Sequence, residues 1–199
     1  MHQRHGRRHR LRRQAGFTLL EVLVAIIVLS FGMLGLAGLQ ATSLKVGREA
    51  GMQAIAVQFA REYGEFLRNN PHIASQATAT GNPYLIAETG EAPEALPTSC
   101  HAAPCTATEL AAWESAEWQR RLLAALPSAR LAVCFDSAPY DTAGQPQWPC
   151  TDAGSGQQPI AVKIGWPRAS TQTGATAIEH ASERPGVVQV VLPGGVGAS

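Results

Sequence analysis

Hydrophobic side chains fill one long stretch near the start of the chain almost without interruption. From Phe17 to Leu39 there are 23 residues, and Glu21 is the only charged one. As an α-helix rising about 1.5 Å per residue, this stretch would be roughly 34 Å long, which is close to the thickness of a bilayer core. The pattern therefore predicts a membrane-spanning helix that carries one carboxylate near its start.

The placement of proline predicts that this helix continues beyond the apolar stretch. All 13 prolines follow residue 70, and the first of them, Pro71, follows Asn69 and Asn70. Because proline disfavours the helical conformation of the residue before it, we expect one helix from about Phe17 to about Asn69, roughly 80 Å long. Its second half carries an apolar stripe at helical spacing that should pack against a globular head: Met52, Ile55, Phe59, Tyr63 and Phe66.

The head is predicted to begin with a loop and a second, shorter helix. Residues 71 to about 106 are rich in Ala, Thr, Pro and Gly, and we interpret them as an irregular surface loop. Thr106 and Glu109 then have the spacing of a capping box, which marks the start of a helix. An apolar face repeats every four residues along this helix, up to Pro127: Trp118, Leu122 and Leu126.

Three short runs after Pro127 alternate between apolar and other residues with a period of two, which is typical of strands covered on one face. The residues expected to share one face are Leu131, Val133 and Phe135 in the first run, Ile160, Val162, Ile164 and Trp166 in the second, and Val188, Val190 and Leu192 in the third. The predicted fold class is α+β, in which a long N-terminal helix packs on a small antiparallel β-sheet with an extra short helix.

Charge is unevenly distributed along the chain. The first 16 residues hold six arginines, three histidines and no acid. The remaining residues hold 10 basic and 15 acidic side chains, a net charge of minus 5. Since binding to phosphates needs a concentrated basic surface, this balance argues against a direct nucleic-acid partner for the part of the chain after Arg13.

Four cysteines, Cys100, Cys105, Cys134 and Cys150, all follow the predicted membrane helix. An even number of cysteines in an exported head indicates two disulfides, for which three pairings are possible. We favour Cys100 with Cys105 and Cys134 with Cys150, because each pair closes a local loop. A zinc site that uses Cys100, His101 and Cys105 is the alternative, but oxidising surroundings and the absence of a second matched pair disfavour it.

Motifs of catalysis are absent from the sequence. It contains no Gly-x-Ser-x-Gly elbow, no phosphate-binding glycine loop, no His-Glu-x-x-His and no Cys-x-x-Cys. Cys100, His101 and Asp152 are a conceivable catalytic triple, but nothing in their spacing supports it. We therefore expect a protein that is not an enzyme, with no catalytic residues, no cofactor and no metal.

A basic leader that ends in glycine and is followed by an aromatic residue and an early glutamate resembles the class III signal of type IV prepilins. The matching segment is Arg12-Arg13-Gln14-Ala15-Gly16-Phe17-Thr18-Leu19-Leu20-Glu21-Val22-Leu23-Val24-Ala25. The resemblance implies that prepilin peptidase cuts between Gly16 and Phe17, and that the new N-terminus at Phe17 is methylated. It also implies that Glu21 neutralises the terminal amine of a neighbouring subunit during filament assembly.

Further segments resemble the PilV class of minor pilins, also called type IV pilus modification proteins. They are Glu21 to Gln40, the break at Asn69-Asn70-Pro71, the cysteine-bearing stretch before a helix that ends at Leu126-Pro127, and Val162-Lys163-Ile164-Gly165-Trp166. The implied division is a cleaved leader at 1–16, a transmembrane and assembly helix at 17–40, its amphipathic continuation at 41–70 and a periplasmic head at 71–199.

The resemblance implies a structural role in a filament. The mature chain would lie in the inner membrane as a single-pass protein, with its N-terminus cytoplasmic and its head periplasmic, and would then enter a cell-surface pilus. Its expected partners are prepilin peptidase, other minor pilins, the major pilin and a tip adhesin. Its expected function is to prime pilus assembly at or near the tip, in support of twitching motility and adhesion.

Three alternatives stay open at this point. An I-type minor pseudopilin of a type II secretion system would share the leader and the long helix. A membrane-tethered enzyme or binding domain would use the helix only as an anchor. An ordinary secretory signal cleaved near Gly35-Leu36-Ala37 would have a shorter apolar core and would leave Glu21 unexplained.

Overall fold

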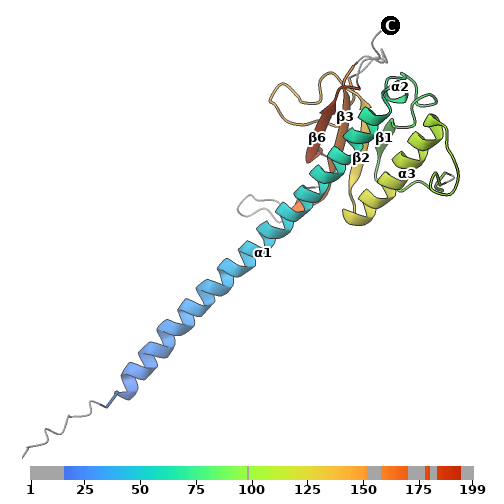
Figure 1. The fold of residues 1–199 in the computed structure, drawn as a ribbon. Helices are drawn as coiled ribbons and strands as arrows, with labels where there is room; N and C mark the ends of the chain where they lie inside the picture. The colour runs from blue at the N-terminus through green and yellow to red at the C-terminus, as the bar shows by residue number, and fades with distance from the viewer. Residues whose placement is uncertain (1–15, 98, 152–157, 170–177, 180–182, 194–199) are drawn as a thin grey trace, which may run out of the picture. The chain divides into compact units, whose positions relative to one another are not determined.

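The structure is a computed structural model that describes residues 16–97, 99–151, 158–169, 178–179 and 183–193 (Figure 1). The chain separates into two compact units, Met1–Val46 and Gly47–Ser199. Helix α1 (Leu19–Asn69) begins in the first unit and ends in the second. Its last residue is the predicted one, and Pro71 opens a short second helix, α2 (Pro71–Ala74).

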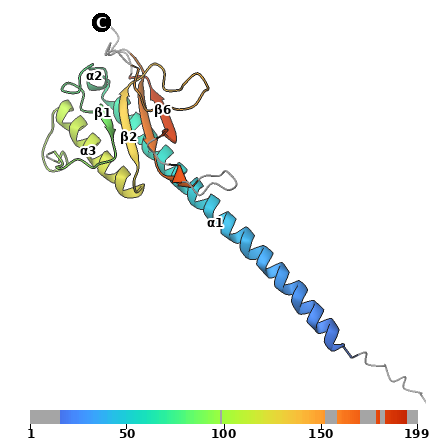
Figure 2. The same ribbon diagram turned by 180° about the vertical axis from the view of Figure 1, so that it is seen from behind.

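The second unit is built on a four-stranded antiparallel sheet in the order β1-β2-β3-β6 (Figures 1 and 2). Its strands are β1 (Ile86–Thr89), β2 (Arg130–Phe135), β3 (Ile160–Gly165) and β6 (Val187–Val191). A separate two-stranded sheet pairs β4 (Arg168–Ala169) with β5 (Ile178–Glu179). Together with the long helix, this sheet confirms the predicted α+β fold class.

Helix α3 (Ala107–Ala125) starts where the sequence predicts. Thr106 accepts the backbone N–H of Glu109 at 3.3 Å, and the Glu109 carboxylate accepts the backbone N–H of Thr106 at 2.8 Å, so the capping box is formed. The hydrogen bonds with Thr106 also lower the pKa of Glu109. The cap therefore supplies acceptors for backbone donors that the first turn of a helix leaves without partners.

The core of the second unit lies between the sheet and two helices, α3 and the part of α1 after Gly47. Trp118 joins the two helices, because its indole N–H donates to the Phe59 carbonyl at 2.9 Å and its ring centroid lies 4.4 Å from that of Tyr63. The predicted faces of β2 and β3 are in this core, and so is the predicted face of α3. Its largest fully buried apolar side chains are Trp118, Tyr63, Tyr84, Leu67, Leu122, Leu126, Leu131, Ile160, Ile164, Val133 and Val162.

The predicted apolar stripe on α1 contacts the core at four of its five residues, but the centre of the buried helix face lies beside it. The buried residues are Ala56, Ala60, Tyr63, Gly64 and Leu67, whereas Ile55 is 36% exposed. Small residues are buried here because they let the helix approach the sheet closely: a Cβ added to Gly64 would lie 3.3 Å from a methyl group of Val191. Met52, Phe59 and Phe66 pack at the edge of this contact and are only partly buried.

The prediction of which residues in the third strand face the core was wrong by one position. Val187 and Val191 contact the core, whereas Val190 and Leu192 are exposed. The reason is the pairing with β3, which sets Val191 opposite Ile160 and Val187 opposite Ile164. Since residues directly opposite each other share a face of the sheet, the register decides which valines are buried.

The predicted surface loop at 71–106 also contains regular structure. Helix α2 lies at its start, and β1 pairs with β2 as an edge strand of the main sheet. Tyr84 and Asn82 are fully buried just before β1. Asn82 donates to the carbonyls of Ala74 and Gln76 at 2.8 and 3.1 Å, so this segment is folded through side-chain to backbone hydrogen bonds.

Substitution of Gly64 tests the close contact between α1 and β6. We expect Gly64→Leu to lower the free energy of unfolding by about 1–3 kcal/mol, because the added side chain has to displace Val191 from a packed core. Gly51→Leu is the matched control, since a Cβ there meets no atom within 4 Å. Thermal or chemical unfolding of the purified variants measures the difference, and equal losses for both variants would contradict the contact.

Candidate functional site

The candidate functional site begins at the first turn of α1. Thr18 caps this turn, because its hydroxyl oxygen accepts the backbone N–H of Glu21 at 3.3 Å and its carbonyl accepts the N–H groups of Glu21 and Val22. Phe17 lies just outside the helix and is 82% exposed. Glu21 is exposed too, and its carboxylate forms no ion pair within the described part of the first unit, residues 16–46.

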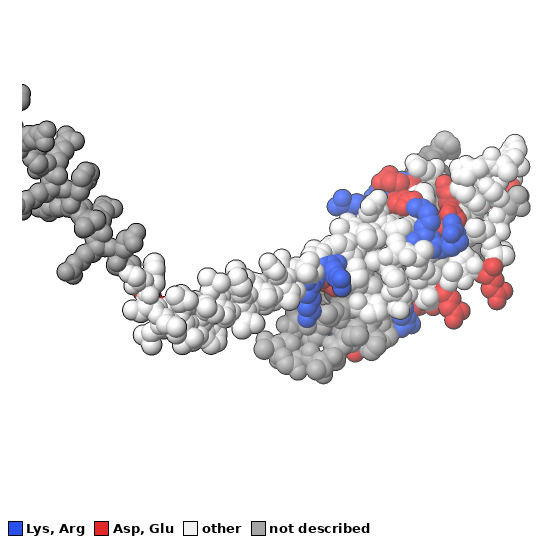
Figure 3. Space-filling model, turned by 90° about the horizontal axis from the view of Figure 1, so that it is seen from below, with Lys and Arg blue, Asp and Glu red and all other residues white. Residues whose placement is uncertain are grey.

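Between Glu21 and Lys45 the surface of α1 is uncharged and largely apolar. No charged residue occurs between Glu21 and Lys45, and the helix surface of this unit is correspondingly white in Figure 3. The most apolar window of α1 has a mean hydropathy of 2.6, and none of it is buried within the protein. By length and composition α1 can cross a membrane, and this supports membrane anchoring of the chain.

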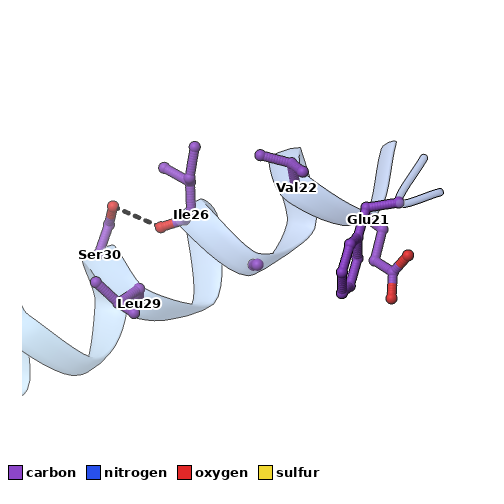
Figure 4. A pocket seen from close by; sticks show the side chains of 7 residues that line it. Glu21, Val22, Ile26, Leu29 and Ser30 are labelled. Carbon is purple, nitrogen blue, oxygen red and sulfur yellow. Dashed lines mark hydrogen bonds between the residues drawn. The ribbon is translucent and has the colours of Figure 1, made fainter. Parts of the chain in front are cut away.

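One face of this apolar helix carries a shallow hollow that includes the glutamate. It is lined by Phe17, Glu21, Val22, Ala25, Ile26, Leu29 and Ser30 (Figure 4). The Ser30 hydroxyl donates to the Ile26 carbonyl at 2.7 Å, so this polar group is satisfied within the helix. Among the residues that line the hollow, Glu21 therefore has a polar side chain without a partner among the described residues.

Three glycines, Gly32, Gly35 and Gly38, follow on the same helix without any packing role inside the chain. A Cβ added at any of them would meet no atom within 4 Å. Glycine costs up to about 1 kcal/mol against alanine in a soluble helix, and small residues in membrane helices let neighbouring backbones approach closely. Since the chain itself does not use these positions for packing, they are available for contact with another helix.

The comparison with protein families supports the interpretation of this segment. A family model described as the prokaryotic N-terminal methylation motif matches residues 11–37. This match supports a type IV pilin-like or pseudopilin protein, which is a structural class, and implies processing by prepilin peptidase and assembly with other pilins. No curated protein and no solved structure matches the chain.

The match includes each residue assigned to processing and assembly from the sequence, namely Gly16, Phe17 and Glu21. Gly16 and Phe17 lie in a non-helical segment immediately before α1, and Glu21 lies in its first turn. The arginines of the leader fall within residues 1–15, which lie outside the described residues. Cleavage after Gly16 and methylation of Phe17 stay predictions.

The four cysteines form the two disulfides favoured from the sequence, Cys100–Cys105 and Cys134–Cys150. The sulfur atoms of Cys100 and Cys105 are therefore not available as thiolates for zinc. His101 packs edge-on against Trp113, with ring centroids 4.7 Å apart. Asp152, the third member of the conceivable catalytic triple, lies outside the described residues. Within the described ranges, no group of three or more His, Cys, Asp or Glu side chains is arranged to hold a metal.

A buried ion pair in the head was missed from the sequence. Lys163 and Asp136 are both fully buried, and the Lys163 ammonium lies 2.5 Å from Oδ2 of Asp136. The ammonium also donates to the carbonyls of Trp148 and Pro149 at 3.1 and 2.8 Å. A single lysine inside an apolar strand was the available signal, because such a lysine must find an anion and acceptors if the strand is covered on both faces.

The ion pair fixes the segment that covers the second face of the sheet. Asp136 Oδ1 accepts the Thr151 hydroxyl at 2.6 Å and the Ala138 N–H at 3.0 Å, close to the Cys134–Cys150 disulfide. Burial alone would raise the pKa of Asp136, but the hydrogen bonds from Lys163, Thr151 and Ala138 outweigh it and lower the pKa. Residues 136–151 are thus held to β3 by the ion pair with Lys163 and to β2 by the Cys134–Cys150 disulfide.

A second polar network lies inside the core, between α1, α3 and the segment before β1. The Tyr63 hydroxyl contacts the Tyr84 carbonyl at 2.7 Å and the Ser115 hydroxyl at 2.9 Å, and the Tyr84 hydroxyl donates to Glu114 at 2.7 Å. Burial is the main reason that the pKa values of Tyr63, Tyr84 and Glu114 are all raised. The network therefore connects the elements of the head through neutral hydroxyl groups rather than forming a reactive site.

Removal of the buried ammonium tests the role of the ion pair. We expect Lys163→Met to lower the free energy of unfolding at neutral pH by about 3–5 kcal/mol, because Asp136 keeps a buried charge without its cation. Arg68→Met is the control, since it breaks an exposed ion pair with Glu65 and should cost about 1 kcal/mol or less. Chemical unfolding curves give both values, and similar losses for the two variants would refute this role.

The same pair predicts how stability depends on pH. The pKa of Asp136 is lowered in the folded state, so its contribution is fully present above the ordinary carboxyl value of about 3.9 and is lost as the pH falls through the lowered value. In Lys163→Met the penalty should instead shrink on acidification, because Asp136 can then take up a proton. Unfolding measured between about pH 3 and pH 7 tests these opposite trends.

Proposed function

We propose that this chain is a minor type IV pilin of the PilV class, incorporated at or near the pilus tip, where it primes pilus assembly. The single observation that carries this proposal is the lone Glu21, which forms no ion pair among the described residues, in the first turn of an apolar helix shortly after the Gly16-Phe17 junction of a matched methylation motif. An anchor without a further role would have no need for a carboxylate at this place.

A comparison of free energies explains why this glutamate needs a partner from another molecule. A carboxylate within a membrane span costs about 2.5–3.5 kcal/mol even on insertion scales. The helix dipole stabilises a negative charge near the N-terminus by only about 0.3–1 kcal/mol, which offsets part of this cost. A cation about 4 Å away contributes about 4 kcal/mol at an effective dielectric constant of 20, which offsets the cost. The free amine of Phe17 on a neighbouring subunit, created by cleavage after Gly16, is the cation we propose.

The rest of the first unit fits assembly with other helices. The apolar surface of α1 is not covered by the protein itself, so it needs either lipid or neighbouring helices. Gly32, Gly35 and Gly38 offer positions where such helices can approach closely. A few pilins bundled together in the membrane would cover one another's helices, and this is why we assign the chain a priming role.

The proposed topology has a cytoplasmic leader and a periplasmic head. Six arginines before Gly16 favour retention of the N-terminus on the cytoplasmic side. The two disulfides then lie in an oxidising compartment, where such bonds form and persist. The proposed partners are prepilin peptidase, the inner membrane, other minor pilins, the major pilin and a tip adhesin.

Substitution of Glu21 tests the proposed assembly step. We expect Glu21→Ala and Glu21→Gln to remove the protein from sheared surface filaments, because neither side chain can neutralise a terminal amine. Both variants should remain in the membrane at normal levels. Glu183→Ala is the control, since Glu183 is exposed in the head and lies outside α1. Immunoblots of the filament and membrane fractions measure the effect, and normal filament levels of Glu21→Gln would contradict the proposal.

A gene deletion distinguishes the pilus from the alternative I-type pseudopilin. Loss of the protein should abolish twitching motility and surface pili while secretion by a type II system continues. Re-expression of the wild-type chain should restore motility. The opposite pattern, with normal motility and lost secretion, would assign the chain to the pseudopilus.

A further inference from the structure

The acid excess of the head is concentrated in one part of the chain. Residues 71–125 hold six acidic and two basic side chains, which is most of the net charge of minus 5 after the leader. Both basic residues, Arg120 and Arg121, are already in ion pairs with Glu117 and Glu62. Glu88 of β1 forms an ion pair with Arg130, whereas Glu91 and Glu94 just after β1 are exposed and form no ion pair among the described residues. The region formed by β1 and α3 is therefore acidic.

Strand β1 in this acidic region is an open edge of the main sheet. It pairs with β2 on one side, and no strand pairs with its other side within the described ranges. Both ribbon views place β1 between β2 and α3 (Figures 1 and 2). An edge strand presents backbone N–H and C=O groups that can pair with an extended segment of another chain.

A groove runs along this edge, between β1 and α3. Uncharged side chains line it on both sides: Leu85, Ala87 and Thr89 from the β1 side, and Ala112, Ala116 and Gln119 from α3. Gln119 donates to the backbone carbonyl of Glu91 at 2.7 Å, which ties α3 to the segment after β1. The alanines of α3 leave space for the inward side chains of an added strand.

We propose that the groove between β1 and α3 binds an extended basic segment of a partner protein, which adds to β1 as a further antiparallel or parallel strand. Its inward side chains pack on Ala112 and Ala116, and its alternate, basic side chains meet the acid excess around β1. A second copy of this chain is disfavoured as the occupant, because two acidic edges would face each other. This inference does not depend on the proposed pilus function.

A synthetic peptide can test the groove directly on the full chain in detergent. The probe is an eight-residue peptide of alternating valine and lysine with blocked ends, and its affinity is measured by fluorescence anisotropy. We expect Ala116→Arg to weaken binding by about tenfold or more, because the larger side chain fills the groove. Ala124→Arg adds the same charge at an exposed position of α3 outside the groove and should bind nearly as well as the wild type.

A modified peptide separates strand pairing from simple charge attraction. The same peptide with alternate backbone amides N-methylated keeps its charge but cannot pair as a strand, so we expect its binding to fall by about tenfold or more. Equal weakening by Ala116→Arg and Ala124→Arg, equal affinity of the N-methylated peptide, or no binding of the parent peptide to the wild type would each overturn the proposal. Circular dichroism of both variants verifies that α3 is intact.

Discussion

A carboxylate at the start of an apolar helix is the constraint on which the account of this protein depends. Glu21 is exposed and forms no ion pair within the described part of the first unit, residues 16–46, and the helix dipole alone cannot offset the cost of placing it in lipid. The chain must therefore meet a cation supplied from outside the described part of this unit. The exposed apolar surface of α1 and its glycines also indicate a contact with another molecule, because both can pack against a second helix.

The head is organised by a different principle, in which buried polar groups hold segments that the hydrophobic core does not reach. Lys163 is fully buried on the face of β3 away from the helices, and it fixes residues 136–151 across that face. The Cys134–Cys150 disulfide closes the same segment. Both faces of β3 are therefore covered, whereas β1 lies at an edge of the sheet.

Local signals in the sequence predicted local features well. Pro71 marked the end of α1, and Thr106 with Glu109 marked the start of α3, because both depend on neighbouring residues alone. The side of β6 that faces the core was missed because valines occupy both faces of this strand, so only its pairing with β3 decides. Ala56, Ala60 and Gly64 were missed because their burial reflects close approach rather than hydrophobic bulk. Glu21 was identified as a candidate because a charge in an apolar run is unusual by itself, and its role in assembly stays a prediction.

Mass spectrometry of the N-terminal peptide of the protein, extracted from native membranes, is the most direct measurement of the central claim. The account predicts a mature chain that begins at Phe17 and carries one methyl group on its amine. Cells that lack prepilin peptidase should instead retain the arginine-rich leader. A chain that begins at any other residue in peptidase-positive cells, or an unmethylated Phe17, would contradict the account.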